Sequence, residues 1–230
     1  MCGRFGLTRP DKLDLRRFGV SVDAPHLAPR FNIPPGDQVL VVRERKGERV
    51  ADLVKWGLVP SWAKDPSIGH RMANARSDTA LSKPSFRIAM QKRRCLIPAD
   101  VFYEWQEIIG QRRKQPWAVT LPDGAIFALG GLWEYWKPPE GGDALVSCTV
   151  LTTEPNNLLE PIHDRMPVIV QPERYRRWLD PMTPLPAVQD MTRSYPSELL
   201  RAWRITTLVN DPEVDDESVL MPVEPGGDAG

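Results

Sequence analysis

Stretches typical of β-strands, separated by turn residues, constrain the fold of this chain most. Residues rich in Val, Ile, Leu and aromatic side chains occupy 38–43, 49–56, 94–105, 115–120, 125–132 and 144–152. Lys46-Gly47 separates the first two, and Pro122-Asp123-Gly124 separates 115–120 from 125–132. β-Branched and aromatic residues favour strands, whereas Gly, Pro and Asp favour turns. The sequence therefore predicts successive β-hairpins, one of which joins 115–120 to 125–132.

Helical patterns are short by comparison. An Asp-capped stretch after Pro10 predicts a helix over 11–18, and amphipathic spacing predicts helices over 173–179 and 197–204. Residues 19–38 are rich in proline but retain apolar side chains, which indicates an irregular crossing segment and not a linker.

Composition bounds the class of protein. The chain has 230 residues, of which 41% are hydrophobic and 26% charged, which is typical of a globular protein. No apolar run reaches the roughly 20 residues of a membrane span, and charges at residues 4–12 interrupt any signal-peptide pattern. We therefore expect no membrane association, a cytoplasmic location (nucleoid-associated in a bacterium) and a monomer. Three cysteines and three scattered histidines predict neither a disulfide framework nor a zinc site.

A formal net charge of zero hides an uneven distribution. Residues 210–230 carry seven acidic residues and no basic one, so the rest of the chain is basic. We expect a domain over 1–209 followed by a disordered acidic tail over 210–230. Of the 30 basic residues, 22 are Arg, whose planar guanidinium suits phosphate. A polyanionic partner is one explanation of this bias, and a GC-rich genome is the other.

Cys2 follows the initiator Met1. Because residue 2 is small, removal of Met1 is the default expectation. An amino-terminal cysteine carries an α-amine with a pKa of about 8 and a thiol with a pKa of about 8.5. Against an aldehyde, the amine forms an imine and the thiol then closes a thiazolidine ring, which no internal cysteine can do. The plain alternative is a cysteine that lies by chance at a frayed terminus.

Four polar residues within the chain are further candidates. Asn74 and Arg76, in the stretch NARSD, project to one side if the stretch is extended. Glu104 lies in an apolar strand, where a carboxylate needs a partner or a raised pKa. His163 precedes a strand and can serve as an acid or base. The alternatives are a local turn at Asn74, a structural salt bridge at Glu104 and a structural histidine.

Two tryptophans flank a loop, WGLVPSW, that proline and glycine bar from regular structure. Trp56, at a strand end, is expected mainly to fill the core. Trp62 is expected to be partly exposed, where an indole can stack on a nucleobase.

These stretches, taken in order, resemble a known family. MCGRF, WGLVPSW, NARSD, FYEW and PIHDRMPVIV are similar to the SRAP family, the abasic-site processing proteins of the SOS-response-associated peptidase type. The resemblance spans about residues 1–209. It implies a β-rich α+β single domain, with a distorted barrel-like sheet and peripheral helices, and no cofactor or metal.

The resemblance also implies an activity in the DNA damage response. A family member binds single-stranded DNA and captures abasic sites as a covalent thiazolidine, with lyase-like and hydrolase-like (peptidase) character. On this chain, Cys2 would be the nucleophile, and Asn74, Glu104 and His163 would position groups or move protons. The DNA strand would be held by Arg4, Trp56, Trp62, Arg76 and Arg165.

Two other function classes stay open. A Met-Cys-Gly start also opens amino-terminal-nucleophile cysteine amidohydrolases, and removal of residues before the cysteine would be peptidase-like autoproteolysis. A non-catalytic single-strand binding module would use Arg and Trp alone. The first leaves WGLVPSW and HDRMP unexplained, and the second leaves Cys2, Glu104 and His163 idle.

Overall fold

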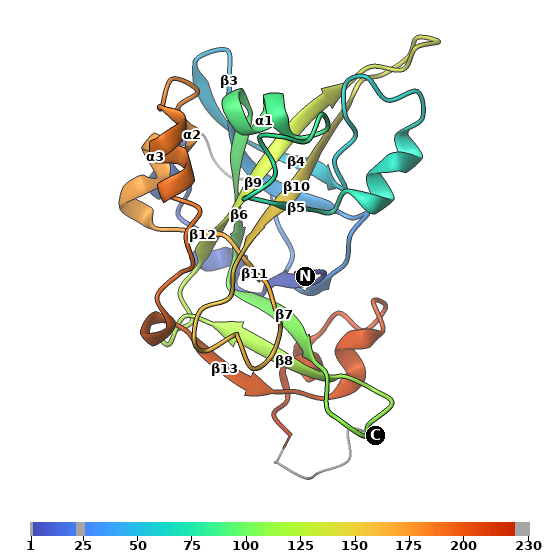
Figure 1. The fold of residues 1–230 in the computed structure, drawn as a ribbon, viewed down its shortest axis with the longest axis vertical. Helices are drawn as coiled ribbons and strands as arrows, with labels where there is room; N and C mark the ends of the chain where they lie inside the picture. Colours follow the sequence, from blue (N-terminus) through green and yellow to red (C-terminus); the bar gives the residue numbers. More distant parts are fainter. Residues whose placement is uncertain (1, 22–25, 224–230) are drawn as a thin grey trace.

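The computed structural model describes residues 2–21 and 26–223, and it is dominated by two β-sheets (Figure 1). The strands of the larger sheet, in spatial order, are β11 (Met166–Pro167), β10 (Leu145–Thr153), β4 (Glu48–Trp56), β3 (Gln38–Arg45), β6 (Arg94–Ala99), β9 (Phe127–Trp136) and β12 (Ile169–Val170), with β5 (Asn74–Arg76) paired to β10. Because β10 also pairs with β9, the strands β10, β4, β3, β6 and β9 close into a ring. The expected barrel-like sheet is confirmed.

The second sheet is open and lies below the ring in Figure 1. Its strands, in spatial order, are β13 (Arg201–Arg204), β8 (Gln115–Thr120), β7 (Val101–Gln106), β1 (Phe5–Leu7) and β2 (Arg30–Ile33). The chain passes from the ring to this sheet at Asp100, between β6 and β7. The amino-terminal strand β1 pairs with both β2 and β7 and is therefore held inside the sheet.

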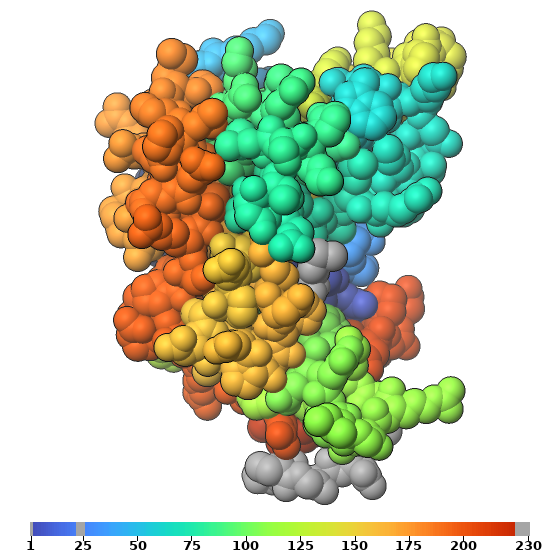
Figure 2. Space-filling view, in the orientation of Figure 1, coloured from blue at the N-terminus to red at the C-terminus, as the bar shows by residue number. Residues whose placement is uncertain are grey.

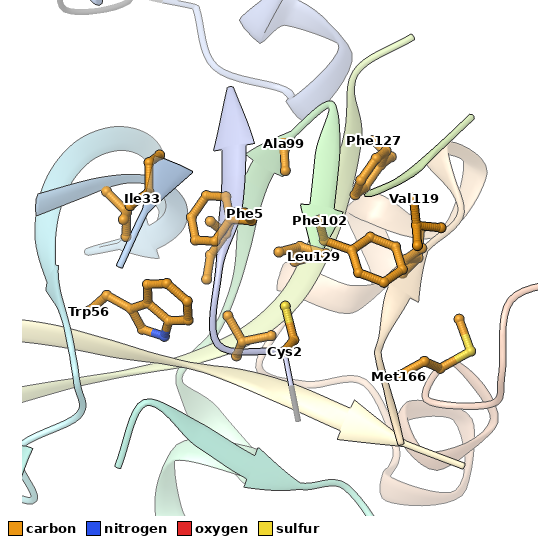
Figure 3. Close-up of a cluster of buried hydrophobic side chains, with 14 of the residues drawn as sticks. Cys2, Phe5, Ile33, Trp56, Ala99, Phe102, Val119, Phe127, Leu129 and Met166 are labelled. Carbon is orange, nitrogen blue, oxygen red and sulfur yellow. The ribbon is translucent and has the colours of Figure 1, made fainter. Parts of the chain in front are cut away.

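Period-two alternation divides the buried residues into separate layers. Along β3, Val39 and Val41 face the interior of the ring, whereas Leu40 and Val42 face outward beneath the helices. The inner layer continues onto one face of the second sheet through Phe5 of β1. The other face of that sheet has its own small cluster, which the carboxy-terminal segment covers. Cys2 belongs to the inner layer (Figure 3).

Helices are short and peripheral, as expected. The α-helices are α1 (Arg87–Lys92), α2 (Tyr175–Leu179) and α3 (Leu185–Asp190). Short 3₁₀ helices are also present in the described ranges: η1 (Pro10–Lys12), η2 (Leu15–Phe18), η3 (Pro66–Arg71), η4 (Pro172–Arg174), η5 (Ser197–Leu199), η6 (Thr207–Asn210) and η7 (Glu217–Leu220). No helix in the described ranges has the length and apolar character to span a membrane.

Three local predictions are wrong. The helix over 11–18 is divided into η1 and η2, with Asp14 as the side-chain cap of η2. The helix over 197–204 is instead η5 followed by β13, which pairs with β8. The hairpin over 115–132 does not form, because β8 and β9 belong to different sheets. Residues 121–126 connect the two sheets, although they carry the expected turn residues.

The expected disorder of the acidic tail is also wrong for residues 210–223. Val209 and Val219 are buried against Val101 and Tyr103 of β7. The Asp215 carboxylate accepts hydrogen bonds from the backbone of β2. Apolar anchors and a carboxylate bonded to backbone N–H groups offset the entropy of ordering this segment. Residues 224–230 of the predicted tail lie outside the described residues.

Candidate active site at the amino terminus

Cys2 is the first described residue and is fully buried. Its side chain belongs to the same buried cluster as Phe5, Trp56 and Met166 (Figure 3). Burial raises the pKa of the Cys2 thiol, and the nearby Glu104 carboxylate raises that pKa further. The thiol is therefore protonated at neutral pH, and it must lose its proton as it reacts.

Asn74 fixes the backbone of Cys2. The residue begins β5, which pairs in parallel with β10 and brings Asn74 opposite Val150. The Asn74 Nδ2 donates a 2.8 Å hydrogen bond to the carbonyl oxygen of Cys2. Its Oδ1 is buried and has no hydrogen-bond partner among the residues that the structure describes. Asn74 therefore holds the cysteine and retains an acceptor for a ligand hydroxyl.

Glu104 lies on β7, and the backbone N–H of its neighbour Tyr103 donates to the Arg4 carbonyl oxygen. Side chains alternate along β7, so Glu104 faces the same inner layer as Phe102 and Cys2. It is 1% exposed, and burial raises its pKa to about 7. A carboxyl with a pKa near neutrality can both give and take a proton at physiological pH.

His163 approaches Glu104 from a separate segment. Asn156 Oδ1 accepts hydrogen bonds from the backbone N–H groups of Leu158 and Leu159, which closes the turn that leads to His163. The His163 Nε2 lies 3.9 Å from the Glu104 Oε2, and its Nδ1 accepts from the Arg165 N–H at 3.0 Å. Burial lowers the pKa of His163, so the ring is neutral at pH 7; its Nε2 faces Glu104, and the Asp164 Oδ1 lies 2.9 Å from its Nδ1.

An open cavity of about 620 Å³ adjoins this histidine. Residues of the β7–β8 hairpin and of the loop over 155–164 line it. Figure 2 shows these two segments, green and yellow-orange, next to each other on one face of the molecule. Solvent therefore reaches the side of His163, although Glu104 behind it is buried.

The arginines expected to hold DNA fall into two groups. Arg76 is exposed and pairs with Asp78 at 3.1 Å, so its guanidinium lies at the surface. Arg165 is 5% exposed, and its Nη2 donates to the Thr152 carbonyl oxygen at 2.7 Å. The Arg4 Nη1 donates to the Asn32 Oδ1 at 2.8 Å. Arg165 and Arg4 thus have internal partners, and their contacts with phosphate stay predictions.

The two tryptophans also differ. Trp56 is fully buried, its Nε1 donates to the Ala73 carbonyl oxygen at 2.8 Å, and its ring packs on Phe5. The expectation that Trp56 contacts DNA is therefore wrong, because no base can reach the ring. Trp62 is 57% exposed on the loop after β4, where stacking is sterically open.

Sequence reasoning missed the residue that anchors Arg4. Asn32 is fully buried, and its side chain bonds both Arg4 and the backbone of the carboxy-terminal segment. Asn32 lies between the apolar residues Phe31 and Ile33 in the proline-rich crossing segment. This position was the available signal, because a polar residue in a buried strand needs hydrogen-bond partners. No group of three potential metal-ligating side chains occurs in the described parts of the chain.

Comparison with known proteins gives the family context. A family model described as "SOS response associated peptidase (SRAP)" matches residues 1–212. The abasic site processing protein YoqW of Bacillus subtilis is 39% identical and covers 96% of this chain and 99% of its own length. The abasic site processing protein HMCES of Pongo abelii is 30% identical over 97% of this chain and 77% of its own length.

Solved structures agree on the fold. A crystal structure of a protein from Bacteroides thetaiotaomicron superposes with a TM-score of 0.82 at 22% identity, over 97% of this chain and 98% of the other. A protein from Bordetella bronchiseptica gives a TM-score of 0.70 at 27% identity, over 89% of this chain and 100% of the other. With the family match over residues 1–212 and the YoqW identity, the chain belongs to the SRAP family.

Proposed function

We propose that this protein binds single-stranded DNA at abasic sites and captures the lesion covalently through Cys2 once Met1 is removed. The observation that carries the proposal is the surroundings of Cys2. A buried second residue is held by Asn74 and lies next to a carboxyl with a pKa near neutrality. The names of the relatives, abasic site processing proteins, supply the substrate class.

The chemistry proceeds without a cofactor. An abasic deoxyribose opens to an aldehyde at C1′ when the ring oxygen gains a proton and the C1′ hydroxyl loses one. The Cys2 amine adds to C1′, and loss of water gives an imine. The thiol sulfur then adds to the imine carbon while its proton passes to the nitrogen. The product is a thiazolidine with new C1′–N and C1′–S bonds, and one water is released.

Each polar residue has a role in this sequence. Glu104, with a pKa of about 7, exchanges protons with the sugar hydroxyl and with the thiol, whose pKa is raised by burial. His163 presents its Nε2 toward Glu104 and moderates the charge of this carboxyl. The Asn74 Oδ1 accepts a hydrogen bond from a hydroxyl of the opened sugar. The same groups acting in reverse would release the DNA, with Glu104 protonating the thiazolidine nitrogen.

The DNA strand is expected to follow the exposed candidates. Arg76 supplies a phosphate contact, and Trp62 supplies a stacking surface. Arg4 and Arg165 support the site from within through their bonds to Asn32 and Thr152. The family description also names a peptidase, and we assign to this activity the cleavage of the bond that precedes Cys2.

The test uses single-stranded DNA with one abasic site. Wild-type protein is expected to give a band of reduced mobility that survives heating in SDS, and Cys2→Ala to give none. Cys2→Ser retains the amine but closes the ring poorly, so it is expected to yield an imine that leads to strand cleavage. Cys148→Ala is the matched control, because Cys148 is an equally buried thiol of the same core layer. Mass spectrometry of the intact protein checks removal of Met1.

Two results would contradict the proposal. A cross-link that persists in Cys2→Ala would place the nucleophile elsewhere. DNA binding without any cross-link in wild-type protein lacking Met1 would favour a binding module, and hydrolysis of amide substrates by that protein would favour an amidohydrolase.

A further inference from the structure

The proposed nucleophile lies at a chain terminus, and chain termini fray unless they are tied down. Covalent capture needs the reacting atoms held close to their productive geometry. Asn74 holds the carbonyl of Cys2 on one side. A second tether begins two residues later, at Arg4.

Arg4 is anchored by its guanidinium. The Arg4 Nη1 donates to the Asn32 Oδ1 at 2.8 Å and to the Val209 carbonyl oxygen at 3.1 Å. The guanidinium is partly removed from water, and this burial lowers the pKa of Arg4. The Arg4 carbonyl oxygen accepts from the Tyr103 N–H. Both ends of Arg4 are therefore held, one by β7 and one by the carboxy-terminal segment.

Asn32 connects Arg4 to that segment. Its Nδ2 donates to the carbonyl oxygens of Asp211 and Val214 at 2.8 Å each, and to that of Val209 at 3.3 Å. The residue is fully buried. A buried amide with this many backbone partners requires the loop over 209–214 to keep one conformation.

Asp215 fixes the loop on β2. Its Oδ1 accepts hydrogen bonds from the backbone N–H groups of Phe31 at 2.5 Å and Asn32 at 2.7 Å. Its Oδ2 pairs with the Arg30 Nε. A carboxylate with three donors is a strong anchor. Asp215 and Val214 lie beyond residue 212, where the family match ends.

We infer that residues 209–215 form a positioning element for the amino-terminal nucleophile, with Asp215 as its anchoring residue. The chain of contacts runs from Asp215 to Asn32, from Asn32 to Arg4, and from Arg4 to Cys2 two residues away. This inference rests on the proposed function for its kinetic consequence, but its structural part stands on the contacts alone. It also reverses the expectation of a disordered acidic tail.

The effect of removing the Asp215 charge separates positioning from electrostatics. Losing a negative charge leaves DNA binding equal or slightly tighter by Coulomb's law. Loosening Arg4 lets Cys2 sample unproductive positions and slows capture. Loss of the charge changes DNA affinity, whereas loss of positioning changes the capture rate. A slower capture rate with unchanged DNA affinity therefore indicates lost positioning and not lost charge.

The experiment compares Asp215→Asn with Asp216→Asn. Both remove one charge from the same segment, but the Asp216 side chain caps η7 at the surface, where it accepts from the Ser218 N–H. Three quantities are measured: the single-turnover capture rate at saturating abasic DNA, the Kd for DNA with a non-reactive tetrahydrofuran site, and amide hydrogen exchange over residues 3–7. Thermal melting confirms that each variant is folded.

For Asp215→Asn we expect capture to slow about tenfold, a Kd within about twofold of wild type, and faster exchange over residues 3–7. Asp216→Asn is expected to match wild type in all three. If Asp215→Asn does not fold, Arg30→Gln gives a milder loss, because it removes one of the three donors to Asp215.

Wild-type capture and exchange in a folded Asp215→Asn variant would overturn the inference. An equal loss of rate and affinity would also overturn it, because the segment would then serve DNA binding. Failure of wild-type protein to capture DNA would instead count against the proposed function, while hydrogen exchange would still test the tether.

Discussion

Glu104 and Glu134 are both buried glutamates, 1% and 5% exposed, yet their surroundings differ. The Glu134 Oε2 accepts from the Arg93 Nη2 at 2.6 Å, and its Oε1 accepts from the Tyr135 N–H at 2.9 Å. Glu104 faces the His163 Nε2 at 3.9 Å, and burial raises its pKa to about 7.

The comparison shows that burial alone does not mark a functional carboxyl. A carboxylate that accepts hydrogen bonds from a guanidinium and a backbone N–H stabilises the fold through these bonds. A carboxyl whose burial outweighs the stabilisation of its charge by nearby groups has a pKa raised toward neutrality and can exchange protons. Glu134 is of the first kind and Glu104 of the second, and three experiments can sharpen or break this distinction.

The largest difference is expected in the chemistry. Glu104→Gln should slow capture of an abasic site by about 10²–10⁴-fold, because a positioned general acid–base is lost. Reversal of the adduct should slow as well, since it uses the same carboxyl. Glu134→Gln should stay within a few-fold of wild type. Single-turnover gels measure both rates, and wild-type kinetics in Glu104→Gln would break the comparison.

The next difference is in stability against pH. The folded-state pKa of Glu104, about 7, lies above its ordinary value of 4.5. The stability that this group contributes is therefore complete below pH 4.5 and is lost as pH rises through 7. Glu104→Gln should gain about 3 kcal/mol relative to wild type between pH 4.5 and 8. Chemical denaturation at both pH values measures this gain.

Glu134→Gln provides the contrast in the same experiment. It removes the charged partner of Arg93, whose side chain is 25% exposed, and should cost about 1–3 kcal/mol at pH 7. A Glu134→Gln variant that gained stability with rising pH, as Glu104→Gln is expected to do, would show that the two carboxyls do not differ in kind.

The smallest effect concerns the histidine beside Glu104. His163→Leu removes the imidazole whose Nε2 faces the carboxyl, so the pKa of Glu104 should rise further. The pH midpoint of capture should therefore move up, by about one unit or less. His70→Leu is the control, since His70 is exposed on η3. An unmoved midpoint in His163→Leu would show that His163 does not tune this carboxyl.

The strands were largely predictable, but their partners were not. The hairpin around Lys46-Gly47 forms as expected, with Lys46 and Gly47 both at positive φ. Residues 121–126 carry the same kind of turn residues, yet β8 and β9 belong to different sheets. Turn residues specify a local change of direction, whereas pairing depends on which edges are available in space.

Residues 197–204 show how tertiary structure overrides a local pattern. Their spacing suits a helix, but the free edge of β8 accepts residues 201–204 as β13. The cation–π contact of Arg204 with Trp117 across these strands accompanies this pairing. A strand that pairs with a sheet edge forms stable backbone hydrogen bonds. An isolated short helix would form its backbone hydrogen bonds only weakly.

Residue types and local patterns were enough to predict the candidates for the chemistry. Cys2, Asn74, Glu104 and His163 were identified from residue type and local pattern, because an amino-terminal cysteine, a carboxyl in an apolar strand and a histidine before a strand are local signals. Which of the expected DNA contacts face solvent depends on tertiary packing and could not be read from local patterns. Trp56 and Arg165 are buried, Trp62 and Arg76 are exposed, and Arg4 is bonded to Asn32 and Val209. Long-range packing sets burial and hydrogen-bond partners, and the partners of Arg4 lie 28 and 205 residues away in the chain.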